Sequence, residues 1–143
     1  MERAHRPALL IWLRLARLVQ HVDRAAEERL KRWDLNLAQF DVLAQVSAAE
    51  GRSQQDLADR LLVTKGNVCQ ILNRMEARGL IVRCPEGRAN SLYLTKAGRA
   101  LAAEAVPDHE QFIAGLFGDL SPAEQHLVLS VTRRMERALR VPE

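Results

Sequence analysis

The sequence is poor in cysteine and in aromatic residues, and it has no apolar run of membrane-spanning length. Its two cysteines, Cys69 and Cys84, form no CxxC pair, so neither a disulfide scaffold nor a cysteine-based metal site is expected. Aromatic residues make up 4% of the 143 residues, so the core must be mainly aliphatic. No secretory signal is recognisable, and we expect a reduced, cytoplasmic setting without membrane association.

Sequence patterns typical of enzymes and metal centres are also missing. The four histidines lie far apart, without HExxH or HxH spacing, at His5, His21, His109 and His126. There is no glycine-rich phosphate loop and no nucleophile elbow. We therefore predict no metal site, no cofactor and no catalysis. The enzymatic alternative, a redox or hydrolytic reaction at Cys69 or Cys84, lacks a nearby histidine or aspartate partner.

Two short helical patterns between residues 53 and 78 are the most informative feature. Ser53, with Asp56 three residues later, is typical of a capping box that starts the first helix. Thr64 is a suitable N-cap for the second helix, and the gap between the two patterns allows only a sharp turn. The second pattern has an apolar stripe formed by Val68, Ile71, Leu72 and Met75. An ordinary helical hairpin and a helix-turn-helix both fit this pattern.

The residues after the second helix favour the helix-turn-helix, because they predict a two-stranded wing. Gly79 can adopt the left-handed conformation that ends a helix, and Leu80–Val82 has high β propensity. Pro85–Gly87 contains residue types that are typical of turns, and it precedes a second run with high β propensity, Ser91–Leu94. The prediction is a winged helix-turn-helix, whose second helix enters the major groove of DNA.

The polar side chains of this unit are assigned to DNA contacts by their chemistry and position. Base edges are expected to meet the first turns of the second helix, at Thr64, Lys65, Gly66, Asn67 and Gln70. Amides such as Asn67 and Gln70 can bond adenine through two hydrogen bonds. Phosphate contacts are expected from Ser53, Gln54 and Arg74. Minor-groove or phosphate contacts are expected from the wing residues Arg83, Arg88 and Asn90.

The charge distribution agrees with a nucleic-acid partner. Residues 60–99 contain eight basic and two acidic residues, a net charge of +6, whereas residues 100–143 have a net charge of −3. The positive charge is therefore concentrated on the segment that would face phosphates. A winged-helix module that binds proteins and has no specific DNA site is the competing interpretation, and this charge counts against it.

Long amphipathic patterns flank the winged unit. Helices are predicted at residues 8–33, 36–46, 95–117 and 121–139, with a kink expected at Pro107. Three long apolar stripes exceed what one small winged domain can cover, so a homodimer interface is favoured over burial within one subunit. The predicted fold is mainly α with a small β-wing. Its divisions are 1–34, an N-terminal dimerisation helix; 35–96, a DNA-binding domain; and 97–143, C-terminal dimerisation helices.

The order of these motifs resembles the multiple-antibiotic-resistance regulator (MarR) family over almost the whole chain. The similar segments are Leu37–Leu43, Ser53–Leu62, Val63–Val68, Arg74–Ile81, Gly87–Ala89 and Tyr93–Arg99. The resemblance implies a transcriptional regulator that binds a pseudo-palindromic operator as a dimer interlocked through its first, fifth and sixth helices. A repressor is expected, with an activator as the alternative. Two departures are Glu86-Gly87-Arg88, where many relatives have an aspartate followed by arginines, and Gly66-Asn67, where small hydroxyl residues are common.

The resemblance also implies a regulatory signal. Related dimers often bind small aromatic or anionic effectors between the winged domain and the helical interface. Trp12, Trp33, Phe40 and Asp41 are conceivable lining residues, although core packing is the alternative for each, as is an arginine partner for Asp41. Cys69, close to Lys65 on the second helix, is a candidate oxidation sensor, with a small, partly buried packing residue as the alternative.

Overall fold

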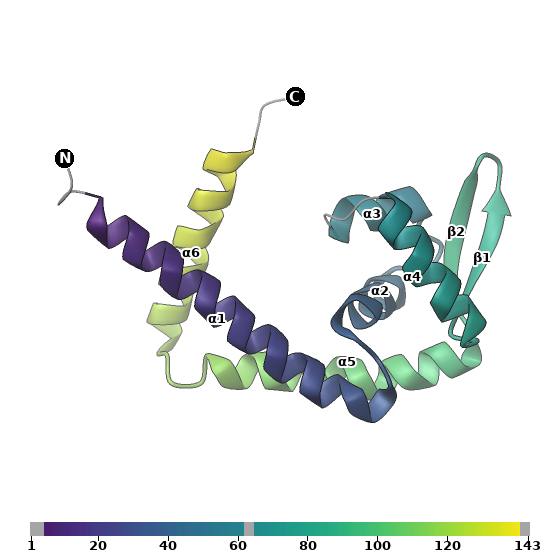
Figure 1. The fold of residues 1–143 in the computed structure, drawn as a ribbon, viewed down its shortest axis with the longest axis horizontal. Helices are drawn as coiled ribbons and strands as arrows, with labels where there is room; N and C mark the ends of the chain where they lie inside the picture. The colour runs from purple at the N-terminus through teal and green to yellow at the C-terminus, as the bar shows by residue number, and fades with distance from the viewer. Residues whose placement is uncertain (1–4, 62–64, 141–143) are drawn as a thin grey trace. The chain divides into compact units, whose positions relative to one another are not determined.

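The computed structural model describes residues 5–61 and 65–140, and it is mainly helical with one two-stranded sheet (Figure 1). The chain divides into two compact units, Met1–Pro107 and Asp108–Glu143, called here the first and second units. The elements are α1 (Arg6–Leu30), the 3₁₀ turn η1 (Lys31–Trp33), α2 (Leu37–Ala48), α3 (Gln54–Leu61), α4 (Lys65–Ala77), β1 (Ile81–Glu86), β2 (Ala89–Leu94), α5 (Lys96–Leu116) and α6 (Pro122–Leu139). This arrangement confirms the predicted mainly helical fold with a β-wing.

Local capping signals explain where several helices begin. Asn36 and Gln39 form a reciprocal capping box at the start of α2, and Ser121 and Glu124 form another at α6. The hydroxyl of Ser53 accepts a hydrogen bond from the backbone N–H of Asp56 at 3.0 Å, which caps α3. These predicted helix starts are confirmed. The predicted cap Thr64 lies outside the described residues.

The end of the first helix differs from the prediction. The predicted α-helix continues to Trp33, but α1 ends at Leu30 and is followed by the tighter turn η1. Asp34 then takes a left-handed conformation with φ of 52°, which reverses the chain toward α2. Hydrophobic periodicity could not reveal this change, because it persists through a 3₁₀ turn of a few residues.

The core of the first unit is aliphatic, as the composition predicts. It brings together side chains from the end of α1, from α2, α3 and α4, from the wing and from the beginning of α5. Fully buried members include Leu30, Leu43, Val46, Leu57, Val68, Leu72, Met75, Ile81 and Leu92. Because every element of the winged unit contributes to this one core, the orientation of α4 is fixed by packing.

The wing is an antiparallel hairpin with a tighter tip than the sequence predicts. Ile81 pairs with Leu94 at its base, and Glu86 pairs with Ala89 at its end. Pro85, expected in the turn, belongs to β1, where an edge strand tolerates the missing N–H. The tip is therefore Gly87-Arg88, and the φ of 62° at Gly87 is the backbone conformation that a type II′ turn requires there.

The junction between the wing and α5 depends on a close backbone approach at Gly98. Thr95 caps α5 by accepting a hydrogen bond from Gly98 N–H at 3.0 Å, and its hydroxyl donates to the carbonyl of Gly79 at 2.6 Å. Thr95 N–H also donates to the carbonyl of Leu80 at 3.0 Å. A Cβ atom placed at Gly98 would lie 2.1 Å from that same Leu80 oxygen. Only glycine therefore fits this position without a backbone shift.

Replacing Gly98 with alanine should lower the free energy of unfolding by about 1–3 kcal/mol, the usual range for an overpacked site. Chemical unfolding in urea at one fixed protein concentration measures this change. Lys96→Ala is the matched control, because it places alanine in the same first turn at an exposed position and should change stability by no more than about 0.5 kcal/mol. A Gly98→Ala protein as stable as the wild type would contradict the proposed contact.

Candidate nucleic-acid interface

The recognition helix of the predicted helix-turn-helix is α4, and its two faces differ in character. Val68, Leu72 and Met75 are fully buried on one face. On the opposite face lies an exposed stripe of hydrogen-bonding side chains, Asn67, Gln70 and Arg74, and Arg78 follows directly after the helix ends at Ala77. The spacing of three and four residues places the three helical members on one side of α4. Thr64 is outside the described residues, and the side chains of Lys65 and Gly66 are not described.

At least three of the eight basic residues between positions 60 and 99 bind partners in the described part of the chain. Arg78 donates to the carbonyl oxygens of Asp34 at 2.6 Å and Trp33 at 3.1 Å, which ties the end of α4 to the turn before α2. Arg83 pairs with Glu76, and Arg99 pairs with Glu50 at 2.9 Å. These contacts hold the three guanidinium groups in defined positions, although Arg78 and Arg99 remain exposed. The exposed cations of this segment include Arg60, Arg74, Arg88 and Lys96.

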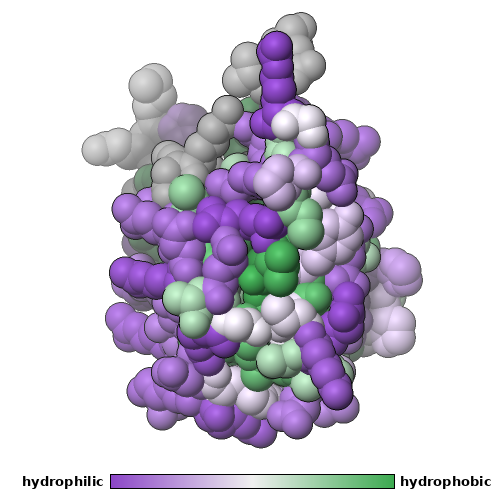
Figure 2. Space-filling model, turned by 90° about the vertical axis from the view of Figure 1, so that its right-hand side faces the viewer, coloured by the Kyte–Doolittle hydropathy of each residue, from purple (hydrophilic) through white to green (hydrophobic). Residues whose placement is uncertain are grey.

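The wing places polar side chains at its tip. Arg88 and Asn90 are exposed there, as the sequence predicts. Behind them, the Tyr93 hydroxyl donates to the Glu86 carboxylate at 3.2 Å, and this hydrogen bond raises the pKa of Tyr93. On the side of the molecule seen in Figure 2, hydrophilic side chains surround a central patch of hydrophobic ones. Exposed polar groups at a narrow hairpin tip suit contact with a groove or a phosphate.

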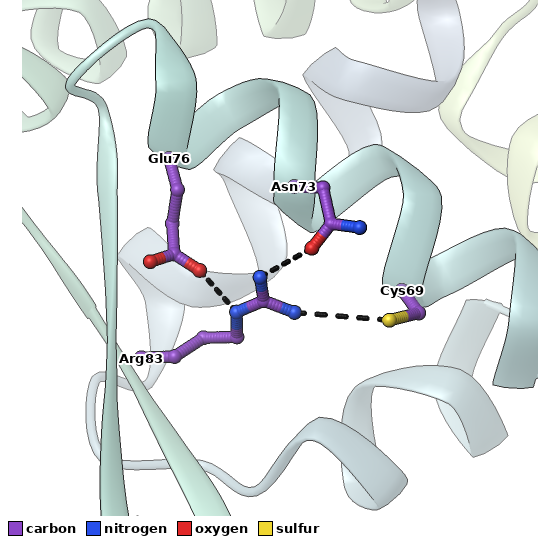
Figure 3. A network of polar contacts seen from close by, with 4 residues as sticks. All are labelled: Cys69, Asn73, Glu76 and Arg83. Carbon is purple, nitrogen blue, oxygen red and sulfur yellow. Dashed lines mark hydrogen bonds and ion pairs between the residues drawn. The ribbon is translucent and has the colours of Figure 1, made fainter.

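Arg83, the other predicted wing contact, is turned toward α4. Its guanidinium donates hydrogen bonds to Glu76 and Asn73, and Nη1 lies 3.8 Å from the Sγ atom of Cys69 (Figure 3). The register explains the direction, because Arg83 is paired with the buried Leu92 and so shares the inner face of the sheet. The sequence shows a basic residue on a strand but not the face to which it points.

The predicted phosphate-binding residues at the start of α3 are half-buried. The Ser53 hydroxyl already accepts a hydrogen bond from Asp56 N–H, and the Ser53 backbone is bridged to Ser91 of the wing. The Oε1 atom of Gln54 is buried without a hydrogen-bond partner among the described residues. Their contacts with DNA stay predictions.

The four candidate effector-lining residues have different surroundings in the described part of the chain. Trp12 is 64% exposed on α1, Phe40 is 3% exposed in the core, and Asp41 is exposed on α2. Trp33 donates its indole N–H to Glu104 at 3.0 Å. A different cleft of about 330 Å³ lies in the first unit and is lined by Ser47, Glu50, Leu94, Arg99, Ala102, Ala103, Val106 and Pro107.

Glu50 holds the edge of this cleft through two hydrogen bonds. Its carboxylate accepts from the backbone N–H of Leu94 at 2.8 Å and from Arg99 at 2.9 Å. The N–H of Leu94 and, to a smaller extent, Arg99 lower the pKa of Glu50 below its ordinary value of 4.5, against a partial opposing effect of desolvation. The charged carboxylate therefore links the loop after α2 to the base of the wing and to α5.

Glu50→Gln should make the protein less stable at neutral pH. Because the folded-state pKa is lowered, the stability that this carboxylate contributes is complete above its ordinary pKa and is lost as the pH falls through the folded-state value. The difference in unfolding free energy between wild type and Glu50→Gln should thus narrow as the pH falls below 4.5. Urea unfolding across this pH range tests the prediction, and a difference independent of pH would contradict it.

The geometry defines a class of protein: a winged helix-turn-helix with an exposed polar recognition helix. A family model described as the MarR family matches residues 33–89. An uncharacterized HTH-type transcriptional regulator of Bacillus cereus is 37% identical over 120 residues, covering 84% of this chain and 82% of that protein. The chain belongs to the MarR family of transcriptional regulators. The family resemblance predicted from the sequence is thereby confirmed, and so is the prediction of a regulator rather than an enzyme.

Two further relatives agree with this assignment. Transcriptional regulator HosA of Escherichia coli is 29% identical over 117 residues, covering 76% of this chain and 87% of that protein. The Staphylococcus aureus MepR–DNA complex superposes with a TM-score of 0.81 at 25% identity, covering 88% of this chain and 96% of that chain. Within the described residues, no helix is long and apolar enough to cross a membrane.

Proposed function

We propose that this protein is a homodimeric transcriptional repressor that binds a pseudo-palindromic DNA operator through α4 and the wing. The observation that supports this most directly is the exposed stripe Asn67, Gln70 and Arg74, which lies opposite the buried stripe Val68, Leu72 and Met75 on α4. Core packing therefore turns amide and guanidinium groups outward, where they match the donor and acceptor pattern of base edges. The related MepR has been solved bound to DNA.

The proposed contacts divide by position along the interface. Base edges are read from the start of the recognition helix by Thr64, Lys65, Gly66, Asn67 and Gln70. Phosphates are held by Ser53, Gln54 and Arg74. Arg88 and Asn90 at the wing tip occupy the minor groove or contact an adjacent phosphate. In the two-fold dimer, the recognition helices address half-sites one DNA turn apart, about 10 base pairs.

Exposed apolar side chains in both units support the homodimer. In the first unit they line the N-terminal part of α1 and include Leu9, Leu10, Ile11, Trp12, Leu13, Leu18 and Val19. In the second unit, α6 buries none of its side chains and exposes Leu127, Val128, Leu129, Val131, Met135 and Leu139. Soluble monomers seldom expose so many large apolar side chains, so a second copy is the proposed cover. Residues 1–34 and 97–143 would supply this interface, and residues 35–96 would bind DNA.

Release of the repressor from DNA is proposed to be caused by the binding of a small aromatic or anionic effector, or by oxidation of Cys69. Such a ligand releases DNA only if it binds the free arrangement of the dimer more tightly than the DNA-bound one. The candidate residues for lining the effector site are Trp12, Trp33, Phe40 and Asp41. The family resemblance supports an effector site in this region. Because a repressor must reach its operator DNA, we propose a cytoplasmic location.

Gln70→Ala and Arg88→Ala should weaken DNA binding in different ways. Loss of the Gln70 amide should cost about 1–3 kcal/mol at the operator and leave binding to unrelated DNA unchanged, because it removes a base contact. Loss of Arg88 should weaken binding to all sequences and reduce the salt slope by about one unit. Fluorescence anisotropy with operator and shuffled duplexes at several salt concentrations measures both effects.

Gln111→Ala is the matched control for these variants, since Gln111 is exposed on α5, belongs to neither the helix-turn-helix nor the wing, and is not one of the exposed apolar side chains proposed for the dimer interface. Its affinity for both duplexes should equal that of the wild type. Equal operator affinity for wild type, Gln70→Ala and Arg88→Ala would contradict the assigned roles.

Leu127→Glu should convert the dimer to a monomer, because it places a charge on the apolar face of α6, where Leu127 is 62% exposed. Sedimentation velocity at micromolar concentration measures the change in mass. His126→Glu adds the same charge to an exposed position about half a helical turn from the centre of that face and should leave the dimer intact. A monomeric wild-type protein, or a Leu127→Glu variant that remains dimeric, would contradict the proposed interface.

A further inference from the structure

One guanidinium on the wing contacts three positions along α4. Arg83 donates to Glu76 and Asn73, and its Nη1 atom lies 3.8 Å from Cys69 Sγ (Figure 3). Cys69, Asn73 and Glu76 are separated by four and then three residues, so they lie along one flank of the helix over two turns. A single side chain therefore connects β1 to a line of positions parallel to the axis of α4.

This flank is distinct from the face proposed to read DNA. With 100° between successive residues of an ideal helix, the centre of this flank lies more than a quarter turn around α4 from the centre of the stripe Asn67, Gln70 and Arg74, although its member Asn73 is only about 60° from Gln70. Because the helix is a stiff hydrogen-bonded rod, holding one flank against β1 fixes the direction in which the other points. Arg83 thus couples the orientation of the reading face to the wing.

The tolerance of base readout shows why such coupling matters. A rotation of α4 by about 20° would move a side-chain tip about 6 Å from the axis by roughly 2 Å. Hydrogen bonds to base edges require donor–acceptor distances within a range of about 0.5 Å. The apolar stripe of α4 limits large rotations, but aliphatic packing is not directional on this scale. A forked guanidinium bonded to two side chains is directional.

The burial of Arg83 argues against a role as a surface phosphate contact. Its side chain is 19% exposed, whereas that of its ion-pair partner Glu76 is 35% exposed. Its charge is used to compensate the Glu76 carboxylate, which would otherwise add a negative charge to the recognition helix. Arg74 and Arg88, by contrast, are exposed.

We infer that Arg83 is a positioning residue for operator recognition: it sets the rotation of α4 against the wing and does not itself bind DNA. This inference rests on the proposed function. It replaces the direct DNA contact that the sequence predicts for Arg83, and it adds Asn73 and Glu76 to the residues on which sequence preference depends.

The test compares operator affinity with affinity for a shuffled duplex of the same length and composition, using the full-length protein. The operator is the sequence enriched from genomic fragments by the wild-type protein. Arg83→Ala should lower operator affinity by about tenfold or more, because base contacts are lost, while affinity for the shuffled duplex changes by less than about twofold and the salt slope is unchanged. The operator affinity of Arg83→Lys should lie between those of the wild type and Arg83→Ala, because one ammonium group cannot bond two partners in the geometry of a guanidinium group.

A double-mutant cycle identifies the partner. Glu76→Ala should also reduce the ratio of operator to shuffled affinity, and Glu76→Ala combined with Arg83→Ala should be no worse than the more damaging single change. Arg88→Ala is the comparison variant, since it should lower both affinities and flatten the salt slope. If Arg83→Ala does not fold, as judged by its thermal unfolding transition, Arg83→Lys and Asn73→Ala give the same comparison.

The outcomes separate this inference from the proposed function. A wild-type protein without operator preference would overturn both. An Arg83→Ala protein with the operator preference of the wild type would overturn the positioning role alone. If Arg83→Ala does not fold, wild-type operator preference in both Arg83→Lys and Asn73→Ala would do the same. Equal losses on both duplexes with a salt slope reduced by about one unit would instead make Arg83 a phosphate contact and overturn the inference.

Discussion

The burial of one face of α4 is the constraint on which the rest of the winged unit depends. Val68, Leu72 and Met75 are each completely buried, and each contributes about 1.5–3 kcal/mol by leaving water. Any rotation that exposed them would lose several kcal/mol, a large part of the stability of a small domain. Their burial therefore determines that Asn67 and Gln70 face outward. The wing and the start of α5 are joined to the same core, through Leu92 and Ala102, so α4 and the wing belong to one packed body.

Polar contacts refine an arrangement that hydrophobic packing sets. Arg78 binds two carbonyl groups before α2, and Arg83 binds side chains along α4. Glu50 connects the base of the wing to α5. In each case a charged group on one element meets partners on another, so these contacts resist the sliding that aliphatic surfaces alone permit. The basic residues of this segment consequently serve two purposes: Arg74 and Arg88 present their charge to solvent, and Arg78 and Arg83 bond to neighbouring elements and hold the recognition helix in place.

The sequence was sufficient to predict the elements whose signals are local. The capping residues Asn36, Ser53 and Ser121, and the left-handed Gly79, act within a few residues of their own position, and the structure confirms each. The partners of Arg78 and Arg83 could not be predicted, because they depend on which faces meet after folding. Hydrogen bonds from Arg78 to Asp34, or from Arg99 to Glu50, cross more than 40 residues of chain. The position of Pro85 in β1 was not predicted, because proline occurs both in turns and in edge strands and the sequence alone does not distinguish them.

In the proposed dimer, α4 and the wing of both subunits read a specific DNA sequence as a symmetric pair. The most direct test is selection of genomic fragments by the purified protein at about 150 mM salt with competitor DNA, where nonspecific electrostatic binding is weakened. We expect enrichment of a pseudo-palindrome whose half-sites lie about one helical turn apart. Recovery of fragments with no shared sequence, from protein shown to be folded and free of bound ligand, would contradict it.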